Sequence, residues 1–119
     1  MVNSVKISPN CKVVEVSEEE EDELKSSRNW DGRSLLVPEH WKNDRKFHLT
    51  LTFPDMYEDT DTFNPLATRL LYELRHPTVQ SNDVICGTAF LSNETLHKLI
   101  DFTKEDFEYI VINARKRNI

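Results

Sequence analysis

The chain has 119 residues, of which 38% are hydrophobic and 30% charged, and this balance fits one globular domain without room for a second. Two glycines and five prolines exclude a collagen-like or linker-type chain and leave no glycine-rich phosphate loop. No apolar stretch approaches the roughly 18 residues of a membrane span, and the N-terminus lacks the apolar core of a signal peptide. We therefore expect a single domain over residues 1–119, soluble and intracellular (cytoplasmic) and not bound to a membrane.

The formal net charge of −6 comes from one acidic run at residues 18–23. Without these six carboxylates the chain would carry equal numbers of acidic and basic residues, so the acidity is a local patch and not the extended charge of a DNA mimic. The pI of about 5.2 and the lack of interleaved basic and aromatic residues argue against nucleic-acid binding. The alternative to a functional patch is that the acidic run is simply a solvated loop or an exposed helix face.

The two cysteines, Cys11 and Cys86, are far apart in the sequence and form no Cys-x-x-Cys pair. Because both adjoin apolar residues, we interpret them as small buried thiols in a reducing compartment. The acidic residues between 55 and 61 lack the glycine and the spacing of a calcium loop. We therefore predict no metal site and no cofactor.

The first half of the chain predicts a hairpin and a short helix. Alternating valine and isoleucine around a Ser-Pro-Asn turn indicate a β-hairpin over residues 4–17. Ser17 is placed to cap an acidic helix over residues 18–26, although the same residues would also suit a disordered loop. The next segment, 27–46, is expected to be irregular apart from a short strand at 35–37.

The second half alternates between strand and helix patterns. Apolar residues alternate with polar ones over 46–53, which indicates a strand with one buried face. A leucine stripe after an Asn-Pro start predicts a helix over 64–76. An apolar strand over 83–91, a helix over 92–100 capped by Ser92, and an apolar central strand over 107–114 complete the prediction.

This order of elements predicts an α+β fold: a two-layer sandwich with a mixed sheet of about five strands and two helices packed on one face. The other face would then be bare and available for a ligand or a partner. Residues 115–119 are expected to form a mobile basic tail.

The strand around His48 and Thr50 carries the one catalytic pattern in the chain. Residues i and i+2 of a strand share a face, so an imidazole and a hydroxyl would meet one ligand. The segment 45–53 resembles a signature strand of the two-histidine (2H) phosphoesterases, whose motif is His-x-Thr in an alternating hydrophobic strand. The resemblance implies that two such strands converge on a phosphodiester, one histidine acting as base and the other as acid.

A second signature strand is not evident. The letters His76-Pro77-Thr78 repeat the motif, but proline cannot donate to a sheet ladder. The hydrophobic segment 110–115 has isoleucine at both motif positions, so it offers no second proton shuttle. The simpler interpretation is that His48 and Thr50 form the polar face of an amphipathic strand.

We therefore expect a small acidic, non-enzymatic regulator or inhibitor that binds a protein with a basic surface. Small domains of this kind are common among accessory proteins, including those of viruses and phages. The residues expected to contact the partner are acidic side chains and aromatic anchors: Glu18, Glu19, Glu20, Glu21, Asp22, Glu23, Trp30, Tyr57, Asp59 and Asp61. The alternative is a 2H-like phosphodiesterase, or a catalytically dead nucleotide-binding relative, that uses the His48 strand. A third possibility is a self-assembling ligand trap, in which two or more chains pair through the hairpin edge between Val5 and Val16 and hold a small anion between them.

Overall fold

A computed structural model describes residues 3–26, 29–35, 48–55, 62–74, 84–94, 99–100 and 102–117. The strands are β1 (Asn3–Ile7), β2 (Val13–Ser17), β3 (Trp30–Ser34), β4 (Leu49–Pro54), β5 (Ala89–Glu94) and β6 (Leu99–Ile100). The helices are α1 (Glu18–Lys25), α2 (Pro65–Leu74) and α3 (Lys104–Arg117). The predicted α+β class is confirmed. In the described part of the chain, no helix is long and apolar enough to cross a bilayer.

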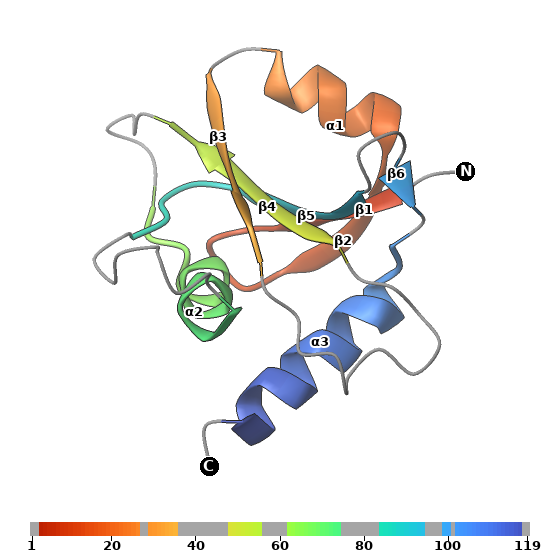
Figure 1. Ribbon diagram of the computed structural model, residues 1–119. Coiled ribbons are helices and arrows are strands. Elements are labelled where there is room, and N and C mark those ends of the chain that lie inside the picture. Colours follow the sequence, from red (N-terminus) through yellow and green to blue (C-terminus); the bar gives the residue numbers. More distant parts are fainter. Residues whose placement is uncertain are drawn as a thin grey trace.

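The sheet is open, with the strand order β2-β1-β5-β4-β3, and the two-residue β6 pairs with the end of β5. Every pairing among the described strands is antiparallel, so the prediction of about five strands is confirmed, but the described sheet is antiparallel and not mixed. In Figure 1, α1 lies above the sheet and α2 and α3 lie below it. The prediction that the helices at 64–76 and 92–100 share one face is not confirmed, because the described end of the second, Leu99–Ile100, is strand β6.

The predicted hairpin is confirmed as β1 and β2. Its turn is closed by two backbone hydrogen bonds, from Cys11 N to Ser8 O and from Ser8 N to Lys12 O, both of 2.9 Å. Pro9 follows Ser8 and suits the first turn position, because its ring fixes φ near the required value. Cys11 has a φ of 67°, which lies in the left-handed region. Its side chain is exposed, so the prediction of a buried thiol is wrong here.

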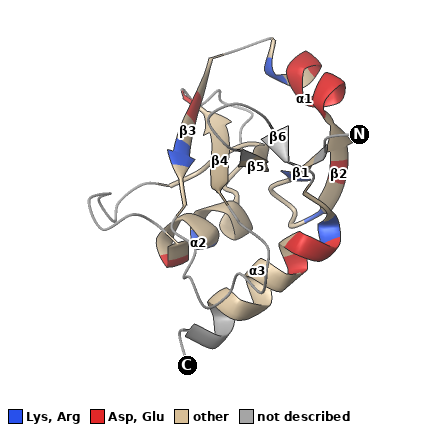
Figure 2. Cartoon of the chain, turned by 45° about the vertical axis from the view of Figure 1, so that its right-hand side comes forward, with Lys and Arg blue, Asp and Glu red and all other residues tan. Residues whose placement is uncertain are grey.

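The predicted acidic helix is confirmed as α1, which begins directly after β2. Ser17 is the last residue of β2 and caps α1, its hydroxyl oxygen accepting a 3.3 Å hydrogen bond from Glu20 N. At the other end, the indole Nε1 of Trp30 donates to Lys25 O at 3.1 Å. Figure 2 shows the acidic residues that cover α1 beside β2. The helix therefore covers one end of the sheet face that lies opposite α2 and α3.

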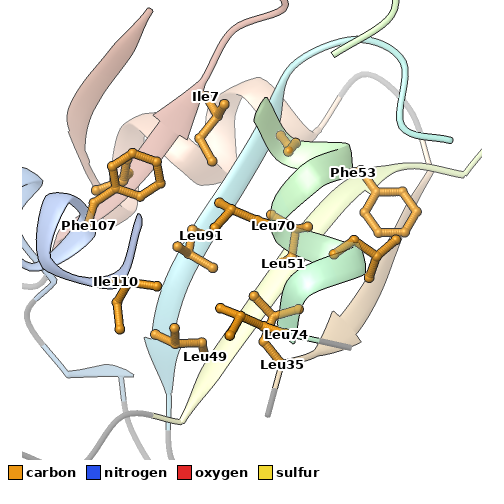
Figure 3. Packing of buried hydrophobic residues seen from close by; sticks show 14 of the residues in the cluster. Ile7, Leu35, Leu49, Leu51, Phe53, Leu70, Leu74, Leu91, Phe107 and Ile110 are labelled. Carbon is orange, nitrogen blue, oxygen red and sulfur yellow. The ribbon is translucent and has the colours of Figure 1, made fainter. Parts of the chain in front are cut away.

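The main core lies between the sheet and the other two helices. Side chains from β1, β4 and β5 meet those of α2 and α3, as Figure 3 shows for Ile7, Leu49, Leu51, Leu91, Leu70, Leu74, Phe107 and Ile110. Each of these is at most 4% exposed. In β4 the alternation of buried and half-buried residues confirms the predicted amphipathic strand over its described part.

Asn64 joins three parts of this layer at the start of α2. Its side-chain oxygen accepts a hydrogen bond from Ala67 N at 3.1 Å and so caps the helix. Its Nδ2 donates to Ile7 O at 3.0 Å and to Gly87 O at 2.9 Å. The predicted helix start is confirmed, and the predicted helix end at 75–76 lies outside the described residues.

The predicted strand over 107–114 is wrong, because these residues belong to α3. The buried side chains Phe107, Ile110 and Ala114 recur at helical spacing, whereas Ile112 is 51% exposed. A capping box starts the helix: Thr103 Oγ1 accepts from Asp106 N, and Asp106 Oδ2 accepts from Thr103 N, each at 3.1 Å. The helix continues to Arg117, so three residues of the expected basic tail extend α3.

Of two further predictions in this region, the helix capped by Ser92 is wrong and the strand over 83–91 is confirmed only for residues 89–91. Ser92 caps no helix but lies buried within β5, and the described end of the predicted helix, Leu99–Ile100, is β6. The strand predicted over 83–91 starts later, at Ala89, because Gly87 has a φ of 86° and interrupts the extended backbone. Before this glycine, Cys86 forms only an isolated antiparallel β-bridge, with Phe63.

The segment predicted to be irregular contains β3. Its sequence, Trp-Asp-Gly-Arg-Ser, has little strand propensity, and pairing with β4 holds it in place. Of the short strand predicted at 35–37, only Leu35 is described; its N donates to Leu49 O at 2.9 Å.

Candidate protein-binding surface

The exposed side of α1 is a cluster of carboxylates. The acidic residues that point to solvent are Glu18, Glu19, Glu20, Asp22 and Glu23. Within the described residues, none of these five forms a salt bridge. The cluster therefore presents negative charge that the neighbouring described side chains do not neutralise. We call these five residues the acidic face of α1.

Glu21 differs from the rest of the run because it is 5% exposed. Its Oε1 accepts a 2.9 Å hydrogen bond from Lys25 Nζ, which forms a salt bridge along the helix. The same ammonium lies 5.2 Å from the ring centroid of Phe90 in β5. Glu21 is therefore an internal anchor of the helix, and the sequence alone did not separate it from the exposed carboxylates.

Trp30 is half-buried at the start of β3 and holds α1 against the sheet. Its ring centroid lies 5.5 Å from that of Phe90, and its indole N–H bonds to the C-terminal end of α1. Phe90 is only 1% exposed, although it points away from the α2 and α3 layer. The sheet face that was expected to be bare is therefore covered at this end by Trp30 and α1.

The other predicted contact residues are not brought together by the described structure. Tyr57, Asp59 and Asp61 lie outside the described residues, so their proximity to α1 stays a prediction. Asp55, which precedes them, is exposed just after β4.

The alternative site around His48 has one histidine. The His48 side chain is exposed, and its backbone N donates to Asn93 Oδ1 at 2.8 Å. Thr50 is half-buried in β4 and pairs with Ser92 of β5. The other three histidines of the chain lie outside the described residues. A second imidazole, which the resemblance to the 2H phosphoesterases requires, would have to come from there.

A groove follows the edge of β2 with which no described strand pairs. Residues of the hairpin and of the first turns of α3 line it: Cys11, Lys12, Val13, Val14, Glu15, Lys104, Phe107 and Glu108. Glu15 Oε2 accepts a 2.6 Å hydrogen bond from Lys104 N, which fixes the start of α3 beside β2. The sequence does not predict this groove, because its pattern over 107–114 predicts a strand where the structure has α3.

No group of histidine, cysteine and acidic residues within the described ranges is arranged to hold a metal ion. Comparison of the chain with protein-family models, curated proteins and solved structures finds no match.

Proposed function

We propose that this chain is a non-enzymatic regulator or inhibitor that acts by binding a protein with a basic surface. The observation that supports the proposal is the acidic face of α1, five exposed carboxylates on a helix that is attached to the sheet at both ends. Carboxylates held at fixed positions attract and orient a cationic partner over about a Debye length, roughly 8–10 Å at moderate salt.

The attachment of α1 matters for this role. Ser17 caps its first turn, and Trp30, Phe90 and the ion pair between Glu21 and Lys25 hold its last turn. A partner would therefore meet carboxylates whose spacing is set before it arrives. Electrostatic steering of this kind raises association rates by roughly 10- to 1000-fold.

The test neutralises two carboxylates of the acidic face and compares the result with the same change elsewhere. The variant Glu19→Gln/Glu23→Gln removes two exposed charges from α1, and Asp55→Asn/Glu105→Gln removes two exposed charges from other elements. Each protein is immobilised, incubated with cell extract and washed at moderate salt, and the retained proteins are identified by mass spectrometry. Association rates are then measured with the purified partner.

We expect wild type and the Asp55/Glu105 variant to retain the same basic partner, and the α1 variant to associate several-fold more slowly at low salt. The difference should shrink as salt is added. Equal rates for all three proteins across the salt series would contradict the proposal. So would a partner with an acidic surface.

A further inference from the structure

The outer edge of β2 has backbone groups available for another strand. β2 is the terminal strand in the sheet order and pairs only with β1 among the described strands. The bond from Ser8 N to Lys12 O fixes the phase of this ladder, because hydrogen-bonded pairs alternate with non-bonded pairs. Val14 therefore directs its N–H and C=O toward β1, whereas Val13 and Glu15 direct theirs outward.

The surroundings of this edge favour an extended ligand. The groove beside it has a volume of about 740 Å³, and the residues that line it include Phe107 and the partly exposed Val13. Val14 is 37% exposed on the opposite face of the strand. An added strand would thus find backbone partners on one side and apolar side chains on both of its faces.

The opposite edge of the sheet is less suitable. β3 contains Gly32 at its centre, and an ion pair of 2.6 Å joins Asp31 and Arg33 on either side of it. Glycine and charged residues are typical of protected edges. β2 instead carries three valines in five residues.

Opposite charges lie at the two ends of β2. Lys12 directly precedes β2, and the acidic face of α1 follows directly after Ser17 at the other end. An antiparallel strand would have its N-terminal end beside α1 and its C-terminal end beside Lys12. Antiparallel pairing is also the commoner arrangement.

We propose that the edge of β2 binds an extended segment of the partner as an added antiparallel strand, with basic residues at the N-terminal end of that segment. This inference rests on the proposed function, since it specifies which part of a basic partner is bound. Backbone bonds to Val13 and Glu15 hold the segment, and the first carboxylates of α1, Glu18 and Glu19, select its charge.

The probe is a synthetic peptide of three arginines followed by alternating valine and threonine. Its affinity is compared with those of three relatives: one N-methylated on the valines, one N-methylated on the threonines, and one with the residue order reversed. Because only alternate residues of an added strand face β2, one methylated set should weaken binding at least tenfold and the other less than twofold. The reversed peptide should bind at least threefold more weakly.

Protein variants provide the matching test. Glu15→Pro removes an outward N–H without removing a bond to β1, so peptide binding should fall at least tenfold. Glu15→Ala removes the same carboxylate and its bond to Lys104 N but keeps the backbone donor, and it should bind the peptide within threefold of wild type. Circular dichroism of both variants verifies that they fold.

The outcomes separate this inference from the proposed function. Equal loss from both methylated sets, or full binding by Glu15→Pro, overturns strand addition, while a salt-sensitive loss in Glu19→Gln/Glu23→Gln still supports recognition by α1. No detectable peptide binding by wild type also overturns strand addition. A concentration-dependent dimer in light scattering that Glu15→Pro abolishes would show that a second copy occupies the edge, which overturns the inference as well.

Discussion

Replacing Asn64 tests how much one buried side-chain amide, which joins α2 to the sheet, contributes to the free energy of unfolding. The side chain is 0% exposed and uses both of its polar atoms: the oxygen caps α2, and the nitrogen bonds to Ile7 O and Gly87 O. We expect Asn64→Ala to destabilise the fold by about 3 kcal/mol, from about 1 kcal/mol for the cap and about 1 kcal/mol for each lost bond to a carbonyl.

The informative variant is Asn64→Asp. At an exposed helix start, aspartate caps as well as asparagine, so the cap alone predicts no loss. Here a carboxylate would keep the bond from Ala67 N but would place an acceptor oxygen against two carbonyl oxygens in a buried site. We therefore expect a cost of about 3–5 kcal/mol, at least as large as that of Asn64→Ala.

Urea unfolding followed by far-UV circular dichroism measures these changes, with equal slopes showing that the unfolded states are comparable. Ser17→Ala is the control, because it removes a partly exposed cap and should cost about 1 kcal/mol. If Asn64→Asp lies within about 0.5 kcal/mol of wild type, the two carbonyl bonds do not stabilise the fold and the reasoning is refuted.

Three further substitutions test other parts of the structure by the same unfolding assay. Cys11→Gly should stabilise the chain by about 0.5–1 kcal/mol, because glycine adopts the positive φ of this turn without strain; no gain would argue against the turn geometry. Lys25→Met keeps the contact with Phe90 but leaves the Glu21 carboxylate without its cation, which should cost about 1–2 kcal/mol since Lys25 is 26% exposed. The double variant with Glu21→Gln should recover most of this loss, and equal instability of both variants would contradict the ion pair. Ile110→Ala should cost about 2–5 kcal/mol and Ile112→Ala under about 0.5 kcal/mol, whereas similar losses would favour a strand, in which these residues share a face.

The sequence predicted elements well where local chemistry and burial pattern agree. The Ser-Pro-Asn turn, the serine cap before the acidic run and the Asn-Pro start of the leucine stripe all lie where the structure has them. In each case a short polar signal marks the boundary of an apolar pattern, so no distant contact is needed to define the element.

The wrong predictions arise where two patterns compete. Three consecutive β-branched residues suggested a strand over 110–112, but the helical spacing of Phe107, Ile110 and Ala114 decides the structure. The Thr103 and Asp106 pair is a capping signal that the sequence contains and that would have identified α3. β3 has no comparable signal, because its polar residues become a strand only through pairing with β4.

The candidate surface was only partly predictable. The acidic run and its helix follow from the sequence, but the burial of Glu21 depends on Lys25 and on Phe90, a residue almost seventy positions away. The place of β2 at the edge of the described sheet depends on the strand order, which brings together segments far apart in the sequence. Contacts of this kind are set by tertiary structure, so no local pattern reports them.

The absence of any linker between β2 and α1 has a thermodynamic consequence. One residue, Ser17, with φ of −76° and ψ of 163°, ends the strand and caps the helix, so the two elements are joined without an intervening loop. Folding has already removed the freedom of this backbone, and a partner that touches both elements need not supply that entropy again. Binding at this junction should therefore lose less conformational entropy than binding to a flexible segment, which favours a higher affinity.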